Sequence, residues 1–144
     1  MPHIYKTALV PYTTEQMFQL ASDIESYPDF LPWCKETKVL SQTGENVTAS
    51  ITMGGAGLEK SFTTTNVLKF AQSIEMRLID GPFSHLYGIW KFQPLGDAGC
   101  KVSLDVKFEI TNKLLRLSLG PVFTKIMNSL VDAFVTRANQ IYGN

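Results

Sequence analysis

Few residues in this chain have the types and the spacing that catalysis requires. The two histidines, His3 and His85, have no nucleophile or paired acid in a recognisable context, and Asp105 is expected on the solvated face of a strand. The sequence contains no paired carboxylates, no Ser/His/Asp set, no phosphate-binding glycine loop and no metal-ligand spacing. A cyclase or hydrolase would need a buried titratable pair, which the expected inward positions hardly offer. The sequence therefore predicts a non-enzymatic protein that requires no cofactor or metal.

The cysteines and the glycine-rich run are interpreted as structural. Cys34 and Cys100 stand far apart with no CxxC spacing, which indicates neither a disulfide framework nor a zinc site. The run GGAG at 54–57 does not open a helix, so it is read as a hairpin turn or a flap at a pocket rim. Residues 1–12 lack the features of a signal peptide, and no apolar run approaches the roughly 18 residues of a membrane span. These features predict a cytoplasmic protein with no transmembrane segment.

Arg137 is the cation expected inside an apolar surface. At about 100° per residue its angle falls between Leu130 and Ile126 on a helix predicted over residues 121–144. A guanidinium cannot lie there without partners. Two interpretations stay open: the side chain reaches water or an acid, or it meets the polar head of a ligand at a pocket mouth.

Length and composition are typical of a single domain, residues 1–144. Hydrophobic residues make up 44% and charged residues 18% of the chain, and a chain of this size buries about two-thirds of its unfolded surface. Thirteen basic and thirteen acidic residues cancel, so no general attraction to nucleic acid, DNA or RNA, or to an anionic membrane is expected. Acidic residues gather at 15–29 and basic residues at 113–137. This asymmetry indicates either two differently solvated faces or a basic binding patch.

Alternating residues predict a curved antiparallel sheet. Between 100 and 110 every even position is apolar and every odd position polar, so one strand face is dry and the other wet. Residues 47–53, 74–78 and 86–93 alternate similarly, with turn signals between the runs. A strand over 3–11, a helix opening at Thr13 with capping-box spacing to Gln16, and a helical turn over 27–34 come first.

The last part of the chain is predicted to be a long helix over 121–144 that covers this sheet. Asn112 is expected to cap a separate turn over 113–117, Gly120 and Pro121 to restart the chain, and Gly143 to end the helix. The apolar arc of the helix consists of Phe123, Met127, Leu130, Phe134, Ala138 and Ile141. The order of elements predicts an α+β helix-grip fold (START-like or Bet v 1-like), with about six to seven strands wrapped on the C-terminal helix.

Aromatic side chains are expected to converge between the sheet and the helix, where they form either a packed core or a cavity wall. Gly88 beside Trp90 leaves space in mid-strand, and small residues are mixed with large ones, which favours an apolar cavity of roughly 300–1,000 Å³. Arg137 and Tyr87 are candidates for contacts to a ligand head group. The residues predicted to bind the ligand are Phe30, Leu31, Trp33, Phe62, Met76, Phe83, Gly88, Trp90, Phe92, Phe108, Phe123, Met127, Leu130, Phe134 and Arg137.

A string of motifs along the whole chain resembles one family. The motifs are YPDFLPWC at 27–34, SFTTTN at 61–66, DGPF at 80–83, GIWKF at 88–92, FEITNKLL at 108–115 and LVDAFVTRANQIYG at 130–143. Together they resemble the coenzyme Q-binding and ribosome-association toxin family of the START-like, or polyketide cyclase/dehydrase, superfamily. The resemblance implies a helix-grip fold with a deep apolar cavity.

The same resemblance implies two functions. The main expectation is non-enzymatic binding of ubiquinone or a related isoprenoid lipid in support of respiration, with transient membrane contact. The alternative is a toxin that binds the large ribosomal subunit and blocks subunit joining. Relatives often carry an arginine where this chain has Thr65, which weakens the ribosomal expectation if that arginine contacts RNA. The exposed basic residues expected to contact a ribosome are Lys35, Lys38, Lys113, Arg116 and Lys125.

Overall fold

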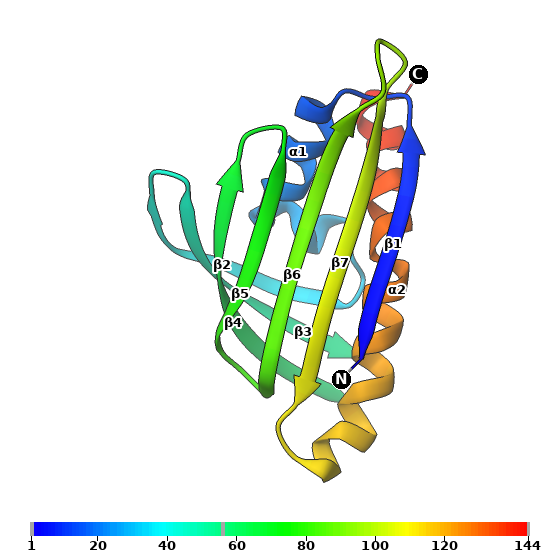
Figure 1. Cartoon of the computed structure of the whole chain (residues 1–144). Coiled ribbons are helices and arrows are strands. Elements are labelled where there is room, and N and C mark those ends of the chain that lie inside the picture. Colours follow the sequence, from blue (N-terminus) through cyan, green and yellow to red (C-terminus); the bar gives the residue numbers. More distant parts are fainter. Residues whose placement is uncertain (1, 56, 144) are drawn as a thin grey trace.

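The computed structural model describes residues 2–55 and 57–143, and within them seven antiparallel strands form one sheet (Figure 1). The elements are β1 (His3–Val10), α1 (Thr14–Ser22), the 3₁₀ helix η1 (Ile24–Asp29), β2 (Cys34–Thr43), β3 (Asn46–Gly55), β4 (Leu58–Lys69), β5 (Ser73–Asp80), β6 (Phe83–Pro94), β7 (Cys100–Ile110) and α2 (Lys113–Tyr142). This is the predicted order of strand, two short helices, six strands and long helix. The α+β helix-grip fold is confirmed.

The strands lie in the order β1-β7-β6-β5-β4-β3-β2, so consecutive strands form hairpins and β1 closes the sheet beside the last strand. β1 pairs with β7 along its full length, from His3 opposite Lys107 to Val10 opposite Cys100. Figure 1 shows the strands curving across the two helices, with α2 running behind β7 and β1. The helices therefore cover one face of the sheet and leave the other face to solvent.

The alternation in β7 places its even-numbered residues in the core. Every even position from Cys100 to Ile110 is buried, whereas none of the odd positions is. Burial of each large apolar side chain stabilises the fold by about 1.5–3 kcal/mol. A shift of β7 by one residue would expose this face, so its burial fixes the register of β7 with its neighbouring strands. The predicted capping box is also present: the Thr13 side chain accepts from the Gln16 backbone, and the Gln16 side chain accepts from the Thr13 backbone.

α2 begins earlier than predicted. It starts at Lys113 and runs for 30 residues, so the expected separate turn over 113–117 and the restart at Gly120 were wrong. Asn112 caps the continuous helix by accepting from the Leu115 N–H at 2.7 Å. A proline ring normally clashes with the Cβ of the preceding residue in a helix, but Gly120 has no Cβ, which lets the helix pass through Pro121. The predicted end at Gly143 is confirmed.

Two predictions of burial also need correction. Ile141 was placed in the apolar arc of α2, but it is 49% exposed. In the segment after η1, Leu31 is buried as expected, whereas Phe30 and Trp33 are only half-buried.

Candidate functional site

A small apolar cavity lies between the sheet, α2 and the α1–η1 segment. Its volume is about 70 Å³, and its walls come from strands β3 to β7 as well as from the three helices. Ligand pockets for small molecules usually measure roughly 300–1,000 Å³. The cavity is therefore smaller than predicted, and a ligand the size of a quinone needs the helix and sheet to separate.

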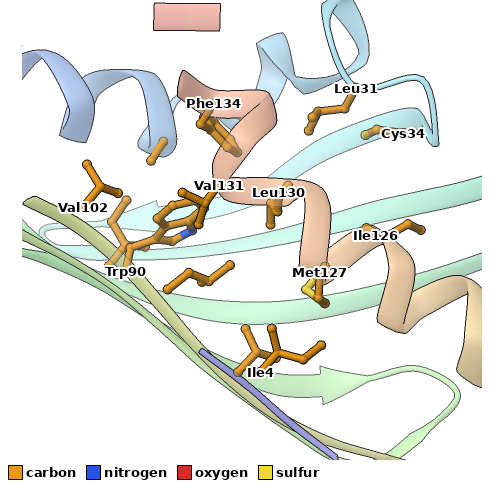
Figure 2. Close-up of a cluster of buried hydrophobic side chains, with 14 of the residues drawn as sticks. Ile4, Leu31, Cys34, Trp90, Val102, Ile126, Met127, Leu130, Val131 and Phe134 are labelled. Carbon is orange, nitrogen blue, oxygen red and sulfur yellow. The ribbon is translucent and has the colours of Figure 1, made fainter. Parts of the chain in front are cut away.

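Nine of the fifteen predicted ligand-binding residues line this cavity. Figure 2 shows Leu130 and Phe134 of α2 near Trp90 of β6. The Trp90 and Phe134 ring centroids are 5.1 Å apart in an edge-to-face arrangement, which closes most of the space between helix and sheet. The nine lining residues are Trp33, Phe62, Met76, Gly88, Trp90, Phe123, Met127, Leu130 and Phe134.

The remaining six predicted residues lie elsewhere. Phe83, Phe92 and Phe108 are buried in the packed core without reaching the cavity wall. Phe30, Leu31 and Arg137 line a separate outer groove of about 310 Å³ between the segment after η1 and α2. Sequence periodicity gave the inward direction of Phe83, Phe92 and Phe108 but could not separate core from cavity, since both are apolar.

Gly88 provides less space than its missing side chain suggests. A Cβ added there would lie 2.8 Å from the terminal methyl of Met76, on the neighbouring strand. The space beside Trp90 is thus occupied by a flexible methionine side chain. Because methionine adapts readily to irregular gaps, the Met76 side chain is a part of the cavity wall that can be displaced readily.

Two polar residues that β4 contributes to the cavity wall were missed. Thr64 and Asn66 are both buried, and the Thr64 hydroxyl donates to the Asn66 Oδ1 at 3.0 Å. The available signal was the alternation in β4: Phe62 was predicted to point inward, so Thr64 and Asn66, two and four residues further along, must share its face. A hydroxyl and an amide in a mostly apolar wall are groups that hydrogen-bond a carbonyl or hydroxyl of a ligand.

Tyr27 is the only ionisable residue among the described residues of the cavity wall. Its hydroxyl donates to the Ala21 carbonyl. Burial raises the pKa of Tyr27 well above its ordinary value, and the nearby Cys34 and Asp23 raise it further. The phenol therefore stays protonated and hydrogen-bonded to the Ala21 carbonyl, which makes it unsuited to acid–base catalysis near neutral pH.

Arg137 lies outside the cavity, along the outer groove. Its guanidinium sits 5.2 Å from the centre of the Phe30 ring, and its Nη1 donates to the Gln140 Oε1 at 3.3 Å. Its Nε is buried and has no hydrogen-bond partner among the described residues. The side chain is thus held mainly by its aromatic neighbour, and no described acid forms an ion pair with it.

The basic residues expected to contact a ribosome lie on different elements. Arg116 and Lys125 line an open groove of about 460 Å³ between α2 and the end of β7, and they share it with Glu109. Lys113 is the first residue of α2, and Lys35 and Lys38 are exposed on β2. The predicted set is thus divided between α2 and β2.

The outer face of the sheet carries a polar network. Glu75 accepts hydrogen bonds from the Tyr87 hydroxyl at 2.8 Å and from the Arg77 Nε at 3.1 Å. The Tyr87 hydrogen bond, with a smaller contribution from Arg77, lowers the pKa of the Glu75 carboxyl. Thr65 lies directly opposite Arg77 in the register of β4 and β5. Tyr87 therefore faces outward, away from the cavity, so the expectation that it contacts a ligand there was wrong.

No three His, Cys, Asp or Glu side chains within the described ranges lie close enough together to hold a metal ion. None of the helices in the described part of the chain is long and apolar enough to cross a membrane.

The curved seven-stranded sheet gripping a long C-terminal helix defines a START-like, helix-grip protein. A solved structure with this fold is the ZhuI aromatase/cyclase from Streptomyces sp. R1128, which superimposes with a TM-score of 0.85 at 17% identity over 96% of this chain and 94% of the other. Residues 10–135 match the family described as polyketide cyclase / dehydrase and lipid transport.

Within that superfamily the chain belongs to the RatA and COQ10 family. It is 47% identical over 142 residues to the ribosome association toxin RatA of Escherichia coli K12, a match that covers 99% of this chain and 90% of the relative. It is 27% identical over 143 residues to the mitochondrial coenzyme Q-binding protein COQ10 homolog B of Xenopus laevis, a match that covers 96% of this chain and 58% of that protein. The similarity to RatA is thus both higher and more complete.

Proposed function

We propose that this protein associates with ribosomes without catalysing a reaction, and that it binds the large subunit and hinders subunit joining. The observation that carries the proposal is the 47% identity to a ribosome association toxin over 99% of the chain. This reverses the priority expected from sequence, where lipid binding came first. A ribosomal partner also agrees with the expected cytoplasmic location.

The small volume of the interior cavity supports ranking ribosome association above lipid binding. A cavity of about 70 Å³ leaves the surface as the part of the molecule that can contact a partner without rearrangement. Thr65 is not basic, but Arg77, which lies directly opposite it on β5 and pairs with Glu75, keeps a largely exposed side chain. Binding to ribosomal RNA depends largely on such exposed cations and their neutralisation of phosphates.

The proposal is tested by sedimentation of the purified protein with isolated ribosomal subunits at low salt. We expect the protein to sediment with large subunits and not with small ones. Adding it to a mixture of both subunits is expected to reduce the peak of joined ribosomes and to raise the two subunit peaks. Equal sedimentation with both subunits, or with neither, would remove the proposal.

A second candidate function is binding of an apolar ligand with a carbonyl head, such as ubiquinone. The apolar cavity with the buried Thr64 and Asn66 pair favours it, as does the similarity to a coenzyme Q-binding protein. Burial of an isoprenoid tail would supply about 25 cal/mol per Å² of apolar surface, provided that α2 moves away from the sheet. Organic extraction of the purified protein followed by mass spectrometry decides the matter: a stoichiometric quinone supports it, and an empty interior opposes it.

A further inference from the structure

A hollow of about 550 Å³ lies on the outer face of the sheet, over β4 to β7 and β1. Figure 1 shows β6 and β7 of this face passing in front of the helices. Three cations, Lys69, Lys91 and Lys101, line the hollow, and none of its described lining residues is acidic. We call this surface the lysine hollow. The chain as a whole has no net charge, so three cations with no acid among their neighbours in the hollow create a local positive potential that attracts an anionic partner.

The strand register brings the three lysines together although they are far apart in sequence. Lys91 lies opposite Ser73 on β5, and Ser73 lies opposite Lys69 on β4. Because neighbouring strands are about 4.8 Å apart, Lys69 and Lys91 are separated by about 10 Å. Lys91 also lies opposite Ser103, two residues from Lys101 on β7, a diagonal spacing of about 7–8 Å.

The two acids that lie opposite Ile89 in the strand register, Glu75 and Asp105, are held by other partners. Asp105 lies 2.5 Å from the Nε2 of His3, and Glu75 pairs with Arg77 at 3.1 Å. Among the described residues, neither of these pairs includes a lysine of the hollow. Lys69 contributes a small part of the lowered pKa of Glu75, so its charge is felt there without direct contact. The three ammonium groups therefore remain available to an external anion.

The hollow also has an aromatic side chain. Tyr5 of β1 is 56% exposed and lines the hollow together with the half-buried Ile89. Gln72 and Gln93 add amide groups that donate to phosphate or sugar oxygens. Tyr5 lies opposite Asp105, whose carboxylate is paired with His3. Lysines combined with an exposed aromatic ring are groups that recognise an RNA strand with an unpaired base.

We propose that the lysine hollow is the surface that binds ribosomal RNA, with the lysines on successive backbone phosphates and an unpaired base against Tyr5. This inference rests on the proposed ribosomal function and assigns a surface to it. RNA fits better than an anionic membrane because the surface is concave, whereas membrane-bound surfaces insert a projecting apolar face between lipids.

The test compares two triple variants that remove the same charge. Lys69→Gln/Lys91→Gln/Lys101→Gln changes the hollow, and Lys35→Gln/Lys38→Gln/Lys125→Gln changes the basic residues that sequence alone favoured. Affinity for isolated large subunits is measured by sedimentation across a range of salt concentrations. Circular dichroism and the melting temperature of each variant establish that it is folded.

The hollow variant is expected to bind at least about 10-fold more weakly at low salt. The slope of log affinity against log salt concentration should be smaller in magnitude by about 2–3. Tyr5→Ala should weaken binding without changing that slope, and Tyr5→Phe should restore it. Unchanged binding by the hollow variant would overturn this surface and leave the ribosomal function standing. Failure of the wild-type protein to bind large subunits would overturn both the lysine hollow as an RNA surface and the ribosomal function. Lysine-dependent binding to phosphatidylglycerol vesicles, without binding to subunits, would overturn the RNA assignment and identify an anionic membrane as the partner of the hollow.

Discussion

Replacing Thr64 by valine is expected to destabilise the protein because it breaks the buried hydrogen bond to Asn66. The change keeps the branched shape and exchanges only a hydroxyl for a methyl group. The Asn66 Oδ1 then loses a donor that lies at 3.0 Å, inside a wall that is mostly apolar. An unsatisfied buried acceptor costs about 1–3 kcal/mol, and we expect Thr64→Val to lower the free energy of unfolding by that amount.

The double variant Thr64→Val/Asn66→Leu separates this cost from a loss of packing. Removing both partners leaves no unpaired group, so we expect the double variant to lie within about 1 kcal/mol of the wild type. The two changes should then show an interaction energy of about 1–3 kcal/mol in a double-mutant cycle. Urea unfolding measures each stability, with equal m-values as evidence that the unfolding reaction is unchanged.

Strictly additive effects, within about 0.5 kcal/mol, would refute the reasoning, because they would mean that the two side chains do not depend on one another. A neutral Thr64→Val would refute it as well, since some other donor must then satisfy Asn66. Thr48→Val is a suitable control: Thr48 lies on β3 opposite Thr65, a residue of the outer face, and the same chemical change there should have little effect.

Three further predictions concern the framework of the fold. Gly99→Ala should lower the free energy of unfolding by more than about 3 kcal/mol, because its Cβ would lie 1.9 Å from the Val10 carbonyl oxygen at a φ of +141°. Gly96→Ala, at a φ of +60° in open space, should lower it by only about 1–2 kcal/mol. Urea unfolding of both variants tests this. Burial raises the pKa of the Cys34 thiol from about 9 to about 11, so native protein should resist iodoacetamide at pH 8 while urea-unfolded protein reacts. Because the folded pKa is the higher one, the corresponding stability is complete below pH 9 and is lost as pH rises towards 11, which pH-dependent urea unfolding would detect. Phe134→Ala should cost about 3–5 kcal/mol, because the ring is 2% exposed and packs on three other aromatic rings; a loss below 1 kcal/mol would show that the cavity collapses around it.

Most of the fold could be predicted because its signals are local. The strict alternation in β7 and the capping box at Thr13 each determine an element within a few residues. The start of α2 could not be predicted in this way. Gly120 and Pro121 usually end a helix, and only the packing of Leu119 and Phe123 in the core shows that the helix continues through them.

The site was harder to predict from the sequence because it depends on distances between elements. Helical periodicity gave the inward direction of Phe123 and Phe134, but the volume left between helix and sheet depends on how side chains such as Met76 fill it. Thr64 and Asn66 could have been found by extending the alternation from Phe62. The lysine hollow could not, since its three cations come from three strands whose register no local pattern specifies.

The most direct test of a ribosome-binding protein that uses its outer face is a lysine-labelling footprint of the wild-type chain. An amine-reactive acylating reagent is applied with and without excess isolated large subunits, and mass spectrometry measures the labelling of each lysine. Protection of Lys69, Lys91 and Lys101, with Lys35 and Lys38 still reactive, is the predicted result. Protection confined to Lys35 and Lys38, or no protection of any lysine at saturating subunit concentration, would contradict it.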